Sequence, residues 1–328
     1  MPTPRSSLRA TSWSSTPQVR PTRCIPTRTA PASWSAETGN SLFGGKAMPI
    51  PETTLARWSH HQAATAFKQA HVPIREALAA HKGLSQFTYE VFLQGSYKND
   101  TNLGGDSDVD VVVRLSTKLK PAVAALAGDQ LQKDGSHRYV HQQWKSFRDE
   151  ALKAMRSRFG RAAESGRKTL KVPKGKIPAD ADLVVTVSHR VGIGFYLSDE
   201  RRWVVSYPQQ HHSRGLMKEK AANNRFKRTV RMFKAARNRL VEKKVLTKED
   251  APSYFIECLL YNVPNAMFKQ DLAPTYTGIL GWLKKAKLRD FQCQNGQVPL
   301  FGRGREQWTV QKAEAFVKAL QGLWDAGG

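Results

Sequence analysis

Apolar residues follow a helical period where the patterned part of the chain begins, near Glu52. The residues that form this repeat are Leu55, Trp58, Ala63 and Phe67. Their spacing is typical of one face of a helix. Because proline disrupts a helix interior, we expect a break near Pro73 and a second short helix over 74–80.

Strand patterns replace the helical period between residues 87 and 207. Residues 87–93 alternate between apolar and polar, and residues 109–115 are a β-branched run flanked by carboxylates. The stretch between them, 95–106, is polar and contains glycines, which is typical of a loop. A helix is predicted over 139–159. The remaining strand candidates are 169–172, 183–188, 194–197 and 203–207.

Helical patterns alone follow after residue 207. The helices predicted there span 218–243, 253–261, 275–288 and 310–324. A chain of 328 residues is long enough for two lobes. We therefore expect an α/β (α+β) fold, with a mixed-sheet lobe over 48–210 that includes the N-terminal helix. A helical lobe over 211–328 is expected to complete a cleft.

Residues 1–47 differ in composition from the rest of the chain. They contain 15 Ser or Thr, six Pro and five Arg, with Glu37 as the single acid, and they follow no strand or helix period. Such a segment cannot bury enough apolar surface to fold. We expect either disorder there or a misassigned start, and prefer the interpretation that Met48 is the true initiator.

Basic residues outnumber acidic ones by 52 to 27, which gives a formal charge of +25. Residues 1–47 carry +5 of it (six basic residues minus Glu37), so 48–328 carry +20. A field of this sign attracts nucleic acid, anionic membranes or nucleoside triphosphates. No apolar run approaches the roughly 20 residues that span a bilayer, and the three cysteines form no Cys-x-x-Cys pair. These features indicate a soluble protein of the reducing cytoplasm, with no membrane partner.

Two carboxylates alternate at the start of the second strand candidate. Residues two apart in a strand share a face, so Asp108 and Asp110 are expected to project together. Like charges side by side repel unless a cation lies between them, and Mg²⁺ prefers carboxylate oxygens together with substrate phosphates. Upstream, Gly95 lets the backbone approach a phosphate closely, and the hydroxyl of Ser96 can hold its oxygens. The pattern predicts a site for a metal-bound triphosphate.

A solvated turn or a calcium loop is the alternative for Asp108 and Asp110. An EF-hand loop needs a later Glu ligand and flanking helices, whereas 111–113 are valines typical of a buried strand. A two-metal reaction also needs a third carboxylate. Asp182 directly precedes an apolar run, as Asp110 does, while Asp180 falls in the preceding loop. We therefore predict Asp182 as the third ligand, with a strand-capping surface position as the alternative.

These residues resemble the polymerase-β-like nucleotidyltransferases, in which Gly-Ser is followed by Asp-x-Asp and a separate third Asp. Other stretches are similar to the bacterial cGAS/DncV-like nucleotidyltransferases, and they are 92–99, 207–211, 225–231 and 252–258. The resemblance covers about residues 50–270. It implies a polymerase-β-like palm with a C-terminal helical lobe, and synthesis of a cyclic di- or trinucleotide from nucleoside triphosphates. Two Mg²⁺ ions, with Mn²⁺ as a substitute, would be held by Asp108, Asp110 and Asp182.

The resemblance also implies the setting of the reaction. The product would act on a downstream effector in antiphage (CBASS) defence, through the nucleotide and not necessarily through protein contact. The animal DNA sensor of the same superfamily has a zinc thumb, whereas this sequence has no Cys/His zinc cluster. Direct activation by DNA is therefore not expected.

Candidate nucleotide-binding residues also lie in the helical half of the chain. On the predicted helix 218–243, Lys227, Arg231 and Lys234 share a face and could grip a triphosphate, with a solvated charged face as the alternative. Ser253 is expected to cap a helix N-terminus, a region that in the family also approaches the nucleotide phosphates.

Base recognition needs side chains that reach a base edge, and amides offer both donors and an acceptor. Asn223 and Asn224 precede the basic stripe, and a short amide favours a pyrimidine. Family members that resemble this chain include makers of uridine-containing cyclic dinucleotides. The alternative is that both are ordinary polar surface positions. His211 and His212 lack an acidic or cysteine partner at metal spacing and are interpreted as structural or surface residues.

Two other functions share part of this pattern. A different transferase of the superfamily, which adds a nucleotide to RNA, a small molecule or a protein, would have the same catalytic residues. A non-catalytic nucleic-acid-binding module would explain the basic charge, but the intact Asp-x-Asp argues against it.

Overall fold

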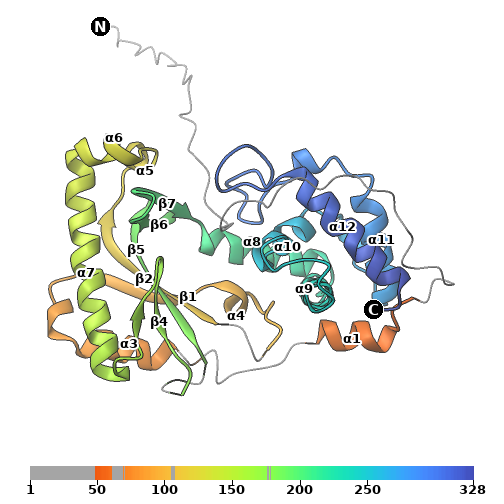
Figure 1. Ribbon diagram of the computed structural model, residues 1–328, viewed down its shortest axis with the longest axis horizontal. Helices are drawn as coiled ribbons and strands as arrows, with labels where there is room; N and C mark the ends of the chain where they lie inside the picture. Colours follow the sequence, from red (N-terminus) through yellow and green to blue (C-terminus); the bar gives the residue numbers. More distant parts are fainter. Residues whose placement is uncertain (1–48, 61–68, 70, 105–107, 176, 178) are drawn as a thin grey trace, which may run out of the picture.

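The computed structural model describes residues 49–60, 69, 71–104, 108–175, 177 and 179–328 (Figure 1). The predictions for 1–47, Ala63 and Phe67 therefore lie outside the described residues. The first described helix, α1 (Glu52–Ser59), carries Leu55 in a fully buried position. The predicted helix over 74–80 is present as α3 (His71–Ala80), which begins two residues before Pro73, so that Pro73 lies in its first turn. Proline is tolerated there because amides of the first turn have no intrahelical partner.

Among the described residues, seven strands form one mixed sheet. They are β1 (Tyr89–Leu93), β2 (Val109–Lys118), β3 (Glu164–Ser165), β4 (Thr169–Val172), β5 (Ala181–His189), β6 (Gly192–Leu197) and β7 (Arg202–Ser206). The central strands β2 and β5 are parallel, whereas the other neighbours pair antiparallel. Each strand predicted from the apolar pattern is present, and the predicted mixed sheet is confirmed.

Helices α3 and α7 (Gly135–Phe159) pack against one face of this sheet (Figure 1). Apolar residues recur every three or four positions along α7, and Trp144 Nε1 donates to the carbonyl of Val185 in β5 at 2.9 Å. The Asp134 side chain accepts the amide of His137 and caps the start of α7. The shorter helices of this lobe are η1 (Lys82–Leu84), α4 (Gly95–Asn99), α5 (Pro121–Ala124) and α6 (Gly128–Lys133).

The second lobe is helical and has its own apolar core. Its elements are α8 (Pro208–Ala221), α9 (Phe226–Glu242), α10 (Ser253–Tyr261), η2 (Asn265–Met267), α11 (Leu272–Leu283), η3 (Leu288–Asp290) and α12 (Val310–Asp325). Helix α1 packs on this lobe and not on the mixed-sheet lobe with which we had grouped it: Leu55 enters the helical core, and the Glu52 carboxylate accepts the amides of Leu272 and Ala273. In the part of the chain that the structure describes, no helix could cross a membrane.

The structure corrects the predictions for 218–243 and for 95–106. We predicted a single helix over 218–243, but this segment is divided between α8 and α9, because Asn223 and Asn224 adopt left-handed backbone conformations with φ of 51° and 59°. We predicted a loop throughout 95–106, but this segment opens with the short helix α4. That helix ends at Asn99, and the next residue, Asp100, is also left-handed with φ of 56°.

Candidate active site

Asp110 and Asp182 lie opposite each other on the parallel strands β2 and β5. The register pairs Asp110 with Asp182, so the two side chains point to the same face of the sheet. Both are half-buried, whereas Asp108 is exposed just before β2. Asp108 is close enough to raise the pKa of both other carboxyls by its charge. The structure therefore brings the three predicted catalytic carboxylates together.

The three carboxylates repel one another, and the charge of Lys171 on β4 offsets only part of this effect at Asp182. Burial raises the pKa of Asp110 to about 7, and the charges of Asp182 and Asp108 act in the same direction. Burial, followed by the charge of Asp108, also raises the pKa of Asp182. Among the described residues, no lysine or arginine forms an ion pair with any of the three. A cation placed between them would favour the ionised carboxylates.

The loop before β5 distinguishes Asp182 from Asp180. Asp180 is exposed, and its carboxylate accepts the backbone amide of Lys174 at 2.6 Å. Asp182 is the residue that pairs with Asp110, and Thr169 Oγ1 donates to its Oδ1 at 3.1 Å. This placement supports Asp182 as the third site residue.

The donor set of the cluster fits a divalent cation, because carboxylate oxygens are hard ligands. Within the described ranges, no three His, Cys, Asp or Glu side chains are arranged to hold an ion by themselves. Magnesium sites in phosphate-transfer enzymes commonly obtain part of their ligands from water and substrate phosphates. The residues thus fit an ion that brings further oxygen ligands with it.

Gly95 places the backbone of α4 directly against Asp110. Its φ is +71°, and a Cβ atom on this residue would lie 1.9 Å from Asp110 Oδ2. No side chain can be accommodated there without moving the carboxylate. The predicted Gly-Ser pair and Asp-x-Asp motif therefore meet, with Ser96 following Gly95 in a half-buried position.

The basic stripe on α9 has partners within the protein. Lys227 Nζ lies 3.1 Å from Asp100 Oδ2. Arg231 donates to the carbonyl of Asp100 and, at 2.8 Å, to the carbonyl of Ser59. Lys234 is fully buried. No acidic residue lies at i+4 from any of the three, and their partners come from other segments of the chain.

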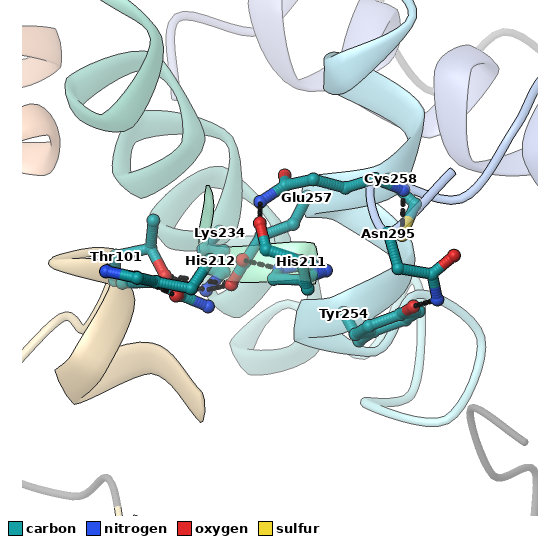
Figure 2. A network of polar contacts seen from close by, with 10 residues as sticks. Thr101, His211, His212, Lys234, Tyr254, Glu257, Cys258 and Asn295 are labelled. Atoms are coloured by element: carbon teal, nitrogen blue, oxygen red, sulfur yellow. Dashed lines mark hydrogen bonds and ion pairs between the residues drawn. The ribbon is translucent and has the colours of Figure 1, made fainter. Parts of the chain in front are cut away.

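Glu257 is the partner of Lys234 and was not among the predicted site residues. Its Oε1 accepts from Lys234 Nζ at 2.5 Å and from Thr101 Oγ1 at 2.8 Å, while its Oε2 lies 2.9 Å from His211 Nε2 (Figure 2). The sequence carries one signal for it, since Glu257 is the only charged residue of the apolar helix α10. A lone charge in such a helix indicates a buried partner.

The remaining candidates lie at the surface or in supporting contacts. The prediction that Ser253 caps α10 is wrong, because Pro252 is the N-cap and Ser253 is an exposed first helical residue. Asn223 and Asn224 are exposed in the turn between α8 and α9. His212 Nδ1 lies 3.0 Å from the Asn99 side chain, so His212, like His211, has a structural contact.

Comparison with known proteins places this site in a family. Residues 74–164 match the nucleotidyltransferase domain, and residues 213–325 match the cGAS/DncV-like nucleotidyltransferase C-terminal helical domain. The cyclic UMP-AMP synthase of Rhodothermus marinus is 41% identical over 86% of this chain and 100% of its own length. A cyclic nucleotide synthase of Staphylococcus haemolyticus is 31% identical over 85% of this chain and 99% of its own length.

A solved structure has the same architecture. The R. marinus c-UMP-AMP synthase with Apcpp and Upnpp superposes with a TM-score of 0.74 at 40% identity, over 85% of this chain and 98% of that one. Nucleotidyltransferases of this kind generally use divalent metal ions. The mixed-sheet lobe is thus the nucleotidyltransferase palm, and the chain belongs to the cGAS/DncV-like nucleotidyltransferases, enzymes that include its cyclic nucleotide synthase relatives.

Proposed function

We propose that this enzyme joins two nucleoside triphosphates into a cyclic dinucleotide, with UTP and ATP as its substrates. The observation that carries the proposal is the pairing of Asp110 with Asp182 directly beside Gly95, with no cation in ion-pair contact among the described residues. The choice of UTP and ATP rests on the R. marinus relative, which matches over its whole length and is named a cyclic UMP-AMP synthase.

In this proposal, each residue group has a separate task. Asp108, Asp110 and Asp182 would hold two Mg²⁺ ions, for which Mn²⁺ could substitute. When bound, the ions make a ribose hydroxyl more acidic and neutralise the charge that develops on the leaving pyrophosphate. Gly95 permits the donor triphosphate to approach the backbone, and Ser96 supplies a hydroxyl to its oxygens.

The bond changes are those of a nucleotidyl transfer. A ribose hydroxyl of the acceptor nucleotide attacks the α-phosphorus of the donor in line, the P–O bond to pyrophosphate breaks, and the hydroxyl proton is released to solvent. In a second transfer, a ribose hydroxyl of the former donor attacks the α-phosphorus of the remaining triphosphate and closes the ring. A cyclic dinucleotide and two pyrophosphates result, and the same cycle extended by one transfer gives a trinucleotide.

Among the basic residues, we assign a direct phosphate contact to Lys227. It lies at the end of α9 nearest Asp100 and is the least buried member of the stripe. Arg231 and Lys234 are turned towards backbone carbonyls and Glu257, and we assign them to support of the site. Ser253 is exposed, and we assign it only a contact to the terminal phosphates of the triphosphate.

We also propose that Asn223 or Asn224 reads a base edge. Their amides are exposed on the segment that leads into Lys227. The competing explanation is that asparagine occupies these positions because it tolerates a left-handed backbone. Substitution by glycine separates the two, since glycine keeps that backbone and removes the amide.

We expect Asn223→Gly or Asn224→Gly to change the proportions of the four bases in the product severalfold, because one hydrogen-bonded base contact is worth about 1–3 kcal/mol. Product composition would be measured by mass spectrometry with all four nucleoside triphosphates present. A parental ratio in both variants would show that these amides do not select the base.

We place the reaction in the cytoplasm, where nucleoside triphosphates are supplied, and its product upstream of a nucleotide-activated effector in antiphage defence. The proposal is tested by incubating the enzyme with four labelled nucleoside triphosphates and Mg²⁺, followed by phosphatase and nuclease digestion and mass spectrometry. A phosphatase-resistant cyclic product is expected. A linear product, or a nucleotide attached to RNA or protein, would favour a different transferase reaction.

A further inference from the structure

Three consecutive residues, Asn99 at the end of α4 and Asp100 and Thr101 after it, are held by side chains of the helical lobe. His212 of α8 contacts the Asn99 side chain at 3.0 Å. Lys227 and Arg231 of α9 contact the carboxylate and the carbonyl of Asp100. Residue 101 is contacted from both α9 and α10. These contacts join the palm segment that follows Gly95 and Ser96 to three separate helices of the other lobe.

The amide, the carbonyl and the hydroxyl of Thr101 each take part in a hydrogen bond. Its amide donates to the carbonyl of Ser96 at 3.0 Å, and its hydroxyl donates to Glu257 Oε1 at 2.8 Å. Lys234 Nζ donates to the Thr101 carbonyl at 3.1 Å and approaches its hydroxyl at 3.2 Å. Thr101 therefore links the backbone of Ser96 directly to a buried ion pair of the helical lobe.

The ion pair itself is enclosed on all sides. Thr101 and Lys234 are each 2% exposed and Glu257 is 4% exposed, and Figure 2 shows the three side chains meeting beside His211. Burial alone raises the pKa of Glu257, but Lys234 and His211 more than offset this effect and hold it below its usual range. An ionised carboxylate here requires all of its donors, because an unpaired buried charge is very costly. The cluster consequently has one favourable arrangement.

On the other side of Ser96, Gly95 is pressed against the carboxylate of Asp110. The first two residues of α4, called here the Gly95–Ser96 turn, are thus fixed between the Asp110 carboxylate and the buried cluster, and α4 lies between the sheet and the helical lobe (Figure 1). We propose that Thr101, Lys234 and Glu257 are positioning residues that set the Gly95–Ser96 turn for the donor triphosphate. This inference rests on the proposed function.

The test uses substitutions of one hydroxyl. Thr101→Val keeps the shape and the backbone bonds of the residue but removes the contact to Glu257, whereas Thr101→Ser keeps that contact. Thr275→Val is the matched control. Thr275 lies in α11, is fully buried like Thr101, and its hydroxyl donates to the Asp271 carbonyl at 2.7 Å. Each variant is measured for its melting temperature, its affinity for a non-reactive ATP analogue with Mg²⁺, and its kcat and KM for pyrophosphate release.

We expect Thr101→Val to lower analogue affinity and kcat/KM about tenfold or more, because small displacements of a phosphate-binding turn have large effects. Thr101→Ser should stay within about threefold of the parent. Thr275→Val should lower the melting temperature and leave affinity and kcat/KM unchanged. If Thr101→Val does not fold, Thr101→Ala carries the same expectation, since water can enter the space that it leaves.

Parental affinity and kcat/KM in a folded Thr101→Val enzyme would overturn the inference. So would equal losses in the Thr101 and Thr275 variants, because a general loss of stability would then explain both. If the parent binds the analogue but makes no cyclic product, the proposed function fails while the affinity comparison still decides the positioning role. If the parent does not bind the analogue at all, both proposals fail.

Discussion

At the residue scale, the contact between Gly95 and Asp110 imposes the strictest requirement of the site. The backbone at residue 95 is left-handed, and the space for a Cβ atom is filled by the carboxylate. The sequence predicted both the glycine and the aspartate from residue chemistry alone. It did not predict that they touch, because the contact depends on how β1 and β2 pair.

We expect Gly95→Ala to lower kcat/KM for pyrophosphate release at least about a hundredfold, because the added methyl group must displace the Asp110 carboxylate. Gly281→Ala is the control, since Gly281 lies in α11 with nothing within 4 Å of its Cβ position. The control should be fully active and about 0.5–1 kcal/mol more stable. Full activity of Gly95→Ala would show that this contact does not shape the site.

Asp108→Asn and Asp110→Asn should each reduce synthesis by at least about a hundredfold, because each removes a charged ligand of ions that act in the transition state. Circular dichroism should show a folded protein in both cases. Asp149→Asn, which alters an exposed carboxylate of α7, serves as the control. A folded Asp110→Asn enzyme that releases pyrophosphate at the parental rate would contradict the site assignment.

At the element scale, the sequence predicted the strands best. Alternation and β-branched runs identify strands that are buried on a sheet, and 169–172 matches β4 at both ends. The helix 253–261 likewise matches α10. The division between α8 and α9 was missed because two asparagines can continue a helix or end it, and tertiary packing decides which.

The buried ion pair between α9 and α10 leads to a prediction for stability against pH. The pKa of Glu257 is below its usual value in the folded protein, so its contribution is present above about pH 4.5 and is lost as pH falls further. We expect Glu257→Gln to cost about 3–5 kcal/mol at pH 7, because Lys234 is left buried without its partner. This difference from the parent should shrink between pH 5 and 3.

Urea unfolding of both proteins across this pH range measures the effect. Glu314→Gln is the control, because Glu314 is exposed on α12 and should differ from the parent by the same small amount at every pH. A difference between Glu257→Gln and the parent that does not depend on pH would mean that Glu257 is not ionised in the folded protein.

At the scale of the whole molecule, the candidate site lies where the palm meets the helical lobe. The decisive contacts join residues far apart in sequence, as Thr101 and Glu257 are separated by 156 positions. Periodicity and motif spacing are local properties and do not reveal such pairs. This is why the sequence predicted the carboxylate cluster and both lobes, but not that Arg231 and Lys234 contact groups of the protein itself.

The most direct test of the central claim is an experimental structure of the enzyme with non-reactive ATP and UTP analogues and Mg²⁺. We expect metal density about 2.0–2.1 Å from carboxylate oxygens of Asp108, Asp110 and Asp182, and the donor triphosphate against Gly95 and Ser96. Nucleotide bound away from this turn, or metal bound without contact to Asp110, would contradict the claim.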